Sequence, residues 1–329
     1  MQALLYGFTC ETGRPTRIPS TASIDALREA VWIDLVNATP EEIDRVQAAT
    51  GIAVPTEAEI SEIETSSRLS ARNGMLYINM PLVSMADGPR AVSVGFVLGR
   101  DRLITIRFAG SRSFDAYADQ LPRGETLHET AAHIFVGLME AIIDRQADSL
   151  EGIRNDLEKI SHRIFRLGAR GGSGSRDEDA RLRHTLSELG TIGDLISHIR
   201  DTQVAAARVV PYVETVAADW LPKDIRARLR TLRRDIASVS DFDTHLNDKL
   251  QFMLDATLGF INIAQNNLMK VMTITSVAGI PPVLVAGIYG MNFKYMPELD
   301  WGWGYAWGLG WIVISTVIPL LIFRWRKWI

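Results

Sequence analysis

Cysteine is almost absent from this sequence of 329 residues, in which Cys10 is the single example. One thiol cannot form a disulfide within the chain, so the sequence excludes a disulfide-stabilised secreted domain and fits a reducing compartment. A secretory leader is also lacking, because no basic segment followed by a sufficiently long apolar stretch comes after Met1. The formal net charge of −4 gives no reason to expect nucleic-acid binding. We therefore expect the amino-terminal part to stay in the cytoplasm.

Motifs for catalysis are missing as well. The sequence has no glycine-rich nucleotide fingerprint and no nucleophile elbow. The stretch LHETAAH at residues 127–133 looks like a zinc-protease helix, but His128 and His133 stand five positions apart where that motif requires four. Five residues place the two rings about 140° apart around a helix, so they cannot share a metal on one face. We expect neither an enzyme nor an organic cofactor.

Charged residues are absent from two long stretches near the carboxyl end, residues 271–290 and 305–323. Each approaches the roughly 20 apolar residues that a helix needs to cross a bilayer. A pair of buried core helices is the alternative, but core helices usually carry a polar stripe. Lys and Arg mark the cytoplasmic side, and here Lys270 precedes the first stretch and a basic tail, residues 324–329, follows the second. The sequence therefore predicts a multi-pass protein of the cell (inner) membrane with both termini in the cytoplasm.

The first 125 residues have the pattern of a mixed α/β domain. A Thr–Pro start, early carboxylates and a closing glycine predict a helix at residues 39–51, and alternating apolar residues predict strands at four places. The expected strands are WIDLVNA (32–38), MLYINMPLVS (75–84), AVSVGFVLG (91–99) and RLITIRF (102–108). We therefore expect a compact cytoplasmic domain at residues 1–125.

Helical spacing of apolar residues dominates the rest of the chain. Residues 126–219 predict a helical hairpin with a flexible glycine-rich tip at Gly168–Asp179. Pro222 starts the next helix where its missing N–H costs nothing, and no strong stop follows before Pro281 and Pro282. The expected segments are a stalk helix at 220–270, a transmembrane helix at 271–291, an extracytoplasmic loop at 292–304, a second transmembrane helix at 305–323 and a tail at 324–329. The fold class is thus an α+β cytoplasmic domain with a long stalk helix and two carboxy-terminal transmembrane helices.

A carboxamide stands at the outer end of the first apolar stretch. Gly290 and Asn292 would place an amide oxygen and helix carbonyls at a mouth, as neutral oxygen acceptors. Mg²⁺ holds its water tightly, so a site that hydrogen-bonds to the hydration shell costs less than one that strips it. Glu298 and Asp300 in the loop would raise the local cation concentration. In the alternative interpretation, Gly290 and Asn292 simply terminate the helix, and the residues alone leave both open.

The residues Tyr289–Phe293 (YGMNF) and Met296–Leu299 (MPEL) resemble the signature of the CorA family of magnesium channels. The similarity extends upstream over LDATLGFINIAQNNLMKVMTITSVAGIPP (254–282) and downstream to the basic tail. It is therefore close over the last part of the chain, whereas the amino-terminal region matches the family in outline. An intact GMN with MPEL favours magnesium over the related zinc transporters.

This resemblance implies a funnel-shaped homopentamer in the lipid bilayer, with the first membrane helix lining a central pore. Two membrane helices cannot enclose a water-filled path alone, so some oligomer is required in any case. The implied selectivity filter is Gly290, Met291 and Asn292, and the implied pore-lining and gate residues are Gly287, Val283, Ile280, Ser276, Thr273, Met272, Met269 and Asn266. Met269, Met272 and Ile280 would form a hydrophobic constriction that gates by dewetting. Val283 departs from the hydroxyl residue that many relatives carry there.

The resemblance also implies that intracellular Mg²⁺ binds acidic residues between neighbouring cytoplasmic domains and holds the channel closed. The candidates for this regulatory metal site are Glu57, Glu59, Glu62, Glu64, Asp235 and Asp241. Thr231 occupies the position of the sensor aspartate of some relatives. Solvated helix faces are the alternative reading of these acids.

Two classes of function follow. The first is a Mg²⁺ influx channel, with Co²⁺ and Ni²⁺ as further candidate ions and with Mg²⁺ as both cargo and regulator. A zinc or other divalent-cation transporter of the same superfamily is its near alternative. The second class is a membrane-anchored helical scaffold, which would be indifferent to Asn292. No nucleic acid and no other protein partner is predicted.

Overall fold

The computed structural model describes residues 4–9, 16–18, 24–62, 68–85, 88–121, 130–169, 176–291, 294, 296–297, 301–326 and 328. The chain divides into two compact units. The first comprises Met1–Glu158 with Glu188–Gln251, and the second comprises Lys159–Ser187 with Phe252–Ile329.

A seven-stranded sheet with the order β2-β1-β3-β7-β6-β5-β4 forms the base of the first unit. Its strands are β1 (Leu4–Thr9), β2 (Thr16–Ile18), β3 (Trp32–Val36), β4 (Leu69–Arg72), β5 (Met75–Ser84), β6 (Arg90–Leu98) and β7 (Leu103–Arg107). The central pair β3 and β7 is parallel, and the other neighbours are antiparallel. The four predicted strands correspond to β3, β5, β6 and β7 and are confirmed.

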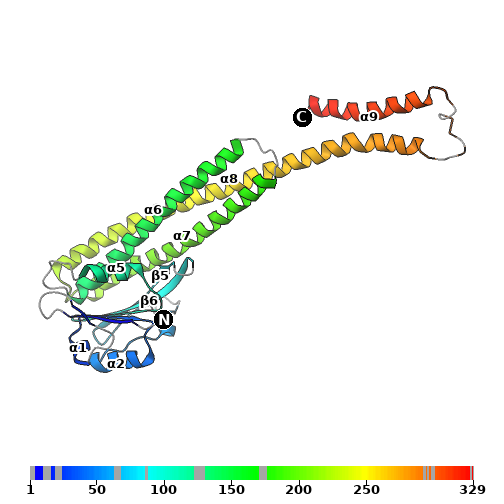
Figure 1. Ribbon diagram of the computed structural model, residues 1–329. Helices are drawn as coiled ribbons and strands as arrows, with labels where there is room; N and C mark the ends of the chain where they lie inside the picture. The colour runs from blue at the N-terminus through cyan, green and yellow to red at the C-terminus, as the bar shows by residue number, and fades with distance from the viewer. Residues whose placement is uncertain are drawn as a thin grey trace. The chain divides into compact units, whose positions relative to one another are not determined.

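Short helices cover one face of this sheet (Figure 1). They are α1 (Ile24–Glu29), α2 (Pro40–Thr50) and α3 (Glu57–Ile60). The predicted helix at 39–51 is confirmed as α2: Thr39 forms a capping box with Glu42, and Gly51 closes the helix with φ 69°. Left-handed backbone is what favours glycine at that end. This layer buries Ile33, Ile104 and their neighbours.

Longer helices pack on the opposite face (Figure 1). They are α5 (Arg112–Gln120), α6 (Ala131–Ala169), α7 (Arg176–Val216) and α8 (Lys223–Tyr289), of which α6 to Glu158, α7 from Glu188 and α8 to Gln251 belong to the first unit. Phe96 of β6 meets Phe135 of α6 edge to face, with ring centroids 5.5 Å apart. The main core therefore lies between the sheet and the helices.

Polar contacts tie α6 and α7 to α8 in the first unit. His133 Nε2 lies 2.8 Å from Asp224 Oδ2, and Arg228 donates to both carboxylate oxygens of Glu140. Arg200 Nε donates to Asp243 Oδ2 at 2.8 Å. His133, from the zinc-protease-like stretch, thus links two helices, while His128 lies outside the described residues.

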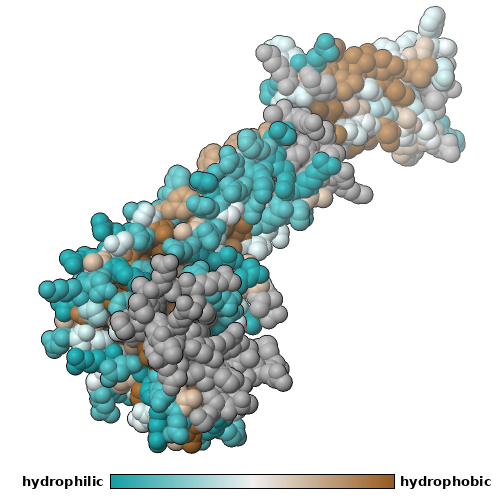
Figure 2. Space-filling view, turned by 60° about the vertical axis from the view of Figure 1, so that its left-hand side comes forward, coloured by the Kyte–Doolittle hydropathy of each residue, from teal (hydrophilic) through white to brown (hydrophobic). Residues whose placement is uncertain are grey.

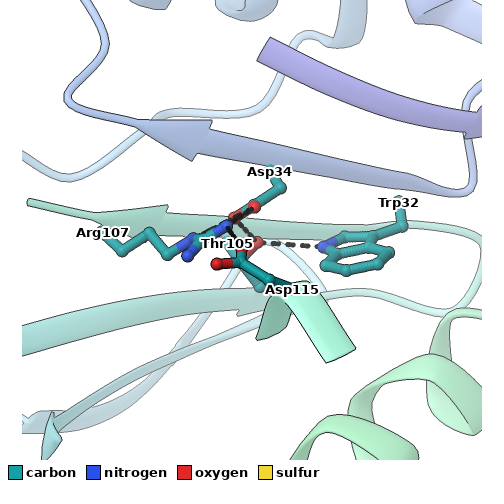
Figure 3. A network of polar contacts seen from close by, with 5 residues as sticks. All are labelled: Trp32, Asp34, Thr105, Arg107 and Asp115. Atoms are coloured by element: carbon teal, nitrogen blue, oxygen red, sulfur yellow. Dashed lines mark hydrogen bonds and ion pairs between the residues drawn. The ribbon is translucent and has the colours of Figure 1, made fainter. Parts of the chain in front are cut away.

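A buried polar network joins β3, β7 and α5 (Figure 3). Trp32 Nε1 donates to Thr105 Oγ1 at 2.9 Å, and that hydroxyl donates to Asp34 Oδ1 at 2.7 Å. Arg107 Nη2 donates to Asp34 Oδ2 at 2.7 Å and to Asp115 Oδ1 at 2.9 Å. Because the sheet surrounds Asp34 and Arg107, the network fixes the start of α5 against the central strands.

The predicted hairpin tip is too long at both ends. Helix α6 continues to Ala169 and α7 begins at Arg176, so both helices extend into the segment Gly168–Asp179. Residues 170–175 lie outside the described part of the chain. A single glycine costs a helix about 1 kcal/mol, which the neighbouring turns can absorb.

The second unit contains the end of α8 and the helix α9 (Gly304–Trp325). Helix α8 passes through Pro281 and Pro282 without a break, as predicted. The most apolar 18-residue windows of α8 and α9 have mean hydropathies of 1.9 and 2.0, and 0% and 6% of these windows are buried. Figure 2 shows the hydrophobic surface gathered on this unit. Buried core helices are therefore excluded, and both helices are long and apolar enough to cross a membrane.

Candidate functional site

One face of α8 packs against α9 in the second unit. The half-buried residues Ile274, Ala278, Pro281, Val285 and Tyr289 recur at spacings of three and four. The ring of Tyr289 lies against Gly308 of α9, 3.8 Å from the place where a Cβ on that glycine would stand. Because one helix turn takes 3.6 residues, these residues form a single stripe. We call these five residues the packing stripe of α8.

The predicted pore residues lie on the other side of the same helix. At 100° per residue, their mean direction is about 160° from the packing stripe. All of them are exposed in the single chain: Asn266, Met269, Met272, Thr273, Ser276, Ile280, Val283 and Gly287. Val283 is 72% exposed and Ile280 58%. A face this open in a single chain meets lipid, another subunit or the water of a pore in the assembled protein.

Hydroxyl groups provide polar points along this uncharged helix. Thr273 Oγ1 donates to the carbonyl of Met269 at 2.8 Å, and Thr275 Oγ1 donates to that of Val271 at 2.9 Å. A hydroxyl that donates back to its own helix keeps its lone pairs available as acceptors. Thr273 and Ser276 on the predicted pore face therefore offer neutral oxygen atoms rather than charge.

Helix α8 ends at Tyr289, directly before the glycine of the GMN motif. Gly290 N donates to Ala286 O at 3.0 Å, and Met291 N donates to Ile288 O at 3.2 Å. Glycine often ends a helix in the left-handed region, but the described glycines with positive φ are Gly51, Gly74 and Gly88. A Cβ on Gly290 would stand 3.1 Å from the carbonyl oxygen of Ala286. The missing side chain therefore leaves the last carbonyls of α8 uncrowded.

Several predicted site residues lie outside the described part of the chain. They are Asn292, Glu298, Asp300 and Glu64. Of the proposed filter, Gly290 and Met291 are described, and both are exposed. The filter assignment at Asn292 therefore remains a prediction from the sequence.

Tryptophan rings gather at the start of α9. Trp307 lies 6.1 Å from Trp301 and 6.1 Å from Trp311, measured between ring centroids. Near the other end of the helix, Phe323 stacks on Trp328 at 5.5 Å. Amphipathic rings at both ends of an apolar helix are typical of the two interfaces of a bilayer.

The acidic candidates of the amino-terminal domain lie on and after α3. Glu57 and Glu59 belong to its first turn. Glu59 Oε2 accepts from Thr56 N at 2.8 Å and from Thr56 Oγ1 at 2.9 Å, and these bonds lower the pKa of Glu59. Glu62 follows the helix, and its carbonyl accepts from Arg68. All three carboxylates are exposed, and Glu59 is already engaged in the helix cap.

The stalk candidates Asp235 and Asp241 are exposed on α8. Burial, followed by the charges of Glu140, Asp148 and Asp235, raises the pKa of Asp144 on α6. Asp235 therefore lies near a row of carboxylates that the sequence analysis missed, although their spacing of four marks one helix face. Within the described ranges of one chain, no three His, Cys, Asp or Glu side chains are grouped closely enough to hold a metal ion.

Comparison with known proteins places these features in context. The family model described as CorA-like Mg²⁺ transporter protein matches residues 28–326. The chain is 32% identical over 329 residues to the magnesium transport protein CorA of Salmonella typhimurium, and the match covers 99% of this chain and 100% of that protein. The magnesium transport protein CorA of Escherichia coli strain K12 gives the same identity and coverage. The complete structure of the CorA magnesium transporter from Methanocaldococcus jannaschii is similar in fold, with a TM-score of 0.72 and 18% identity over 100% of this chain and 99% of that one.

Proposed function

Because this chain belongs to the family of CorA-like Mg²⁺ transporter proteins, we propose that it forms a channel through which Mg²⁺ enters the cell, driven by the membrane potential. The observation that carries this proposal is the open, uncharged face of α8 opposite the stripe that packs on α9. A tether needs only length and hydrophobicity, whereas a pore needs one helix with two distinct faces. The second face of α8 supports a pore over a scaffold.

Several copies of α8 are needed to enclose such a pore. We infer a homopentamer from the family resemblance, with α8 inside and α9 outside. In this arrangement α9 faces lipid with its apolar residues, and the exposed face of α8 meets water and the ion. We infer that the protein lies in the inner membrane with both termini in the cytoplasm, because Lys and Arg mark the cytoplasmic side and flank the two apolar stretches.

The filter is assigned to Gly290, Met291 and Asn292. A ring of Asn292 carboxamides, together with the carbonyls that Gly290 leaves uncrowded, would accept hydrogen bonds from the water shell of Mg²⁺. Neutral oxygens bind a divalent ion weakly enough for it to leave, which conduction requires. Glu298 and Asp300 would concentrate cations at the mouth. We propose that this filter also admits Co²⁺ and Ni²⁺, whose hydrated forms carry the same charge.

The gate is assigned to the apolar rings of Met269, Met272 and Ile280, which would exclude water when narrow. The hydroxyl groups of Thr273 and Ser276 stand between them as polar points. Intracellular Mg²⁺ would act as the regulator by binding carboxylates such as Glu57, Glu62, Asp235 and Asp241 of adjacent subunits. A bound cation offsets repulsion among these acids and so favours the closed state through its higher affinity for that state.

Ion flux into proteoliposomes tests the function directly. The full chain, reconstituted with an inside-negative potential, is expected to take up Mg²⁺, and Asn292→Ala is expected to abolish uptake while leaving assembly unchanged. Near wild-type uptake by a correctly assembled Asn292→Ala variant would contradict the filter. Uptake of Zn²⁺ in preference to Mg²⁺ would favour the alternative of a zinc transporter, and absence of any metal flux would favour the scaffold.

A further inference from the structure

A cavity of about 420 Å³ lies in the first compact unit, beside the start of α5. Its walls come from the end of β5, the first residues of α5, the middle of α6 and a part of α7. Leu82, Ile142, Ile153 and Ile199 contribute apolar surface. The volume falls in the range of small-molecule sites, roughly 300 to 1,000 Å³. None of the transport functions proposed above uses this cavity.

The amino-terminal end of α5 opens onto the cavity through Ser111, Arg112 and Ser113. Ser111 is the N-cap residue, but its hydroxyl makes no capping hydrogen bond, and the first helical bond runs from Asp115 N to Ser111 O. The three preceding N–H groups therefore have no acceptor within the helix. Together with the helix dipole, they favour an anion at this end.

Two guanidinium groups add positive charge to the lining. Arg112 and Arg145 both line the cavity, and within the described residues neither forms an ion pair. Asp156, the acid of the same lining, already has an interaction of its own. Arg112 and Arg145 also line a neighbouring hollow of about 500 Å³, together with Arg228 and the three acids Glu140, Asp144 and Asp148. The two arginines are thus shared, and an anion is favoured in the first cavity because its lining contains one acid instead of three.

A buried carboxamide in the wall points independently to a ligand. Gln146 lines the cavity and is 6% exposed, and its Oε1 has no hydrogen-bond partner. An unpaired buried acceptor costs about 1 to 3 kcal/mol. Leucine would fill this position beside Ile142 and Leu150 without that cost. This oxygen is closed to solvent, so the carboxamide must turn about its side-chain bonds to accept from an N–H or O–H donor on a bound molecule.

We propose that this cavity binds a small organic phosphate. The phosphate group lies at the start of α5 between Arg112 and Arg145, the body of the molecule packs on the apolar wall, and a donor on that body meets Gln146. Phosphate is preferred to carboxylate because the lining offers two guanidinium groups, two hydroxyls and backbone N–H groups, more donors than two carboxylate oxygens accept. The site is independent of the proposed conduction pathway, so either proposal can fail without the other.

Calorimetric titration of the full chain in detergent tests the site, at one fixed concentration of free Mg²⁺. The probes are 4-aminophenyl phosphate, phenyl phosphate, inorganic phosphate and aniline. We expect both aryl phosphates to bind saturably and more tightly than inorganic phosphate, and aniline not to bind. The double variant Arg112→Gln/Arg145→Gln should weaken the binding of both aryl phosphates about tenfold or more, because it removes the charge-assisted hydrogen bonds to the phosphate.

Two further variants separate binding from folding. A Cβ on Gly152 would meet no atom within 4 Å outside the nearby backbone of its own helix, so Gly152→Leu should project into the cavity, block both probes and leave the melting temperature intact. Gln146→Leu should weaken 4-aminophenyl phosphate and not phenyl phosphate, without lowering the melting temperature. Arg154→Gln, an exposed residue of α6 outside the lining, is the matched control. Absence of saturable binding of either aryl phosphate, or equal affinities in wild type and the double variant, would overturn the proposal.

Discussion

Arg107 and Asp34 form a buried ion pair, with Nη2 and Oδ2 2.7 Å apart and with 5% and 3% of their side chains exposed. The same nitrogen also contacts Asp115, whose side chain is 60% exposed. One cation thus has a buried and an exposed partner at nearly equal distances. The contrast separates the effect of burial from the effect of geometry.

We expect Asp34→Ala to destabilise the first unit by about 3 to 5 kcal/mol, because it leaves a buried guanidinium without its main counter-charge. Asp115→Ala should cost about 0 to 1 kcal/mol, since exposed ion pairs contribute little. Both losses of stability are measured by heating the full chain and monitoring unfolding through the protease sensitivity of the amino-terminal domain. Equal losses in the two variants would mean that burial does not govern this pair.

Gly290→Ala should reduce Mg²⁺ flux while the assembled protein remains intact. The added methyl group would stand 3.1 Å from the carbonyl oxygen of Ala286 and crowd the end of α8. Gly279→Ala is the matched control, because a Cβ there meets no atom within 4 Å outside the nearby backbone of its own helix. Proteoliposome uptake of Mg²⁺ by the two variants provides the comparison, and equal uptake would remove the role assigned to Gly290.

Hexaammine cobalt should block the channel from outside. This ion carries its six ligands rigidly and resembles fully hydrated Mg²⁺, so a filter that binds the water shell should hold it without releasing it. Uptake of Mg²⁺ at rising concentrations of the blocker measures the effect. Free passage of Mg²⁺ in a saturating concentration of hexaammine cobalt would argue against recognition of the hydrated ion.

Intracellular Mg²⁺ should protect residues 223–265 of the stalk from proteolysis. A ligand at ten times its Kd stabilises the state that it binds by about 1.4 kcal/mol per site, and several such sites shift an oligomer strongly. Asp235→Asn should raise the Mg²⁺ concentration needed for protection, because it removes one of the charges that repel one another near Asp144. Cleavage rates that do not change with the Mg²⁺ concentration would contradict regulation by intracellular Mg²⁺ and would indicate that the membrane potential or another ligand controls the gate.

The stability contribution of Asp243 should depend on pH in the direction opposite to that of an ordinary salt bridge. Burial raises the pKa of Asp243, although the hydrogen bond and the charge of Arg200 act against it. The folded state therefore disfavours the charged carboxylate. This loss of stability is fully present above the pKa of the folded state, and it disappears as the pH falls through that pKa toward the lower pKa of the unfolded state. Asp243→Asn should raise the melting temperature at neutral pH, with an advantage that shrinks on acidification.

Asp241→Asn provides the comparison for this pH series, since Asp241 is exposed on the same helix. The melting temperature of each variant is measured relative to wild type at every pH. An advantage of Asp243→Asn that grows as the pH falls would show that the ion pair with Arg200 outweighs the burial of the carboxylate.

Local patterns were sufficient for some elements and insufficient for others. Helix α2 was predictable because Thr39, Pro40 and Gly51 supply a cap, a first turn and a left-handed end within one short segment. Strands β1, β2 and β4 were not predicted. They have three to six residues, and such strands form because a neighbouring strand supplies their hydrogen bonds rather than because their own residues demand it.

The sequence by itself determined the two apolar helices, because a stretch of about 20 uncharged residues is stable in lipid as a helix. It also determined the family, through the GMN and MPEL residues. Tertiary structure decided which residues meet. The parallel pairing of β3 with β7 brings Asp34 to Arg107 across 73 positions of sequence, and the packing of Tyr289 on Gly308 selects the face of α8 that stays open. Four segments build the cavity around Gln146. Such contacts depend on the register and packing of distant elements, which no local periodicity encodes.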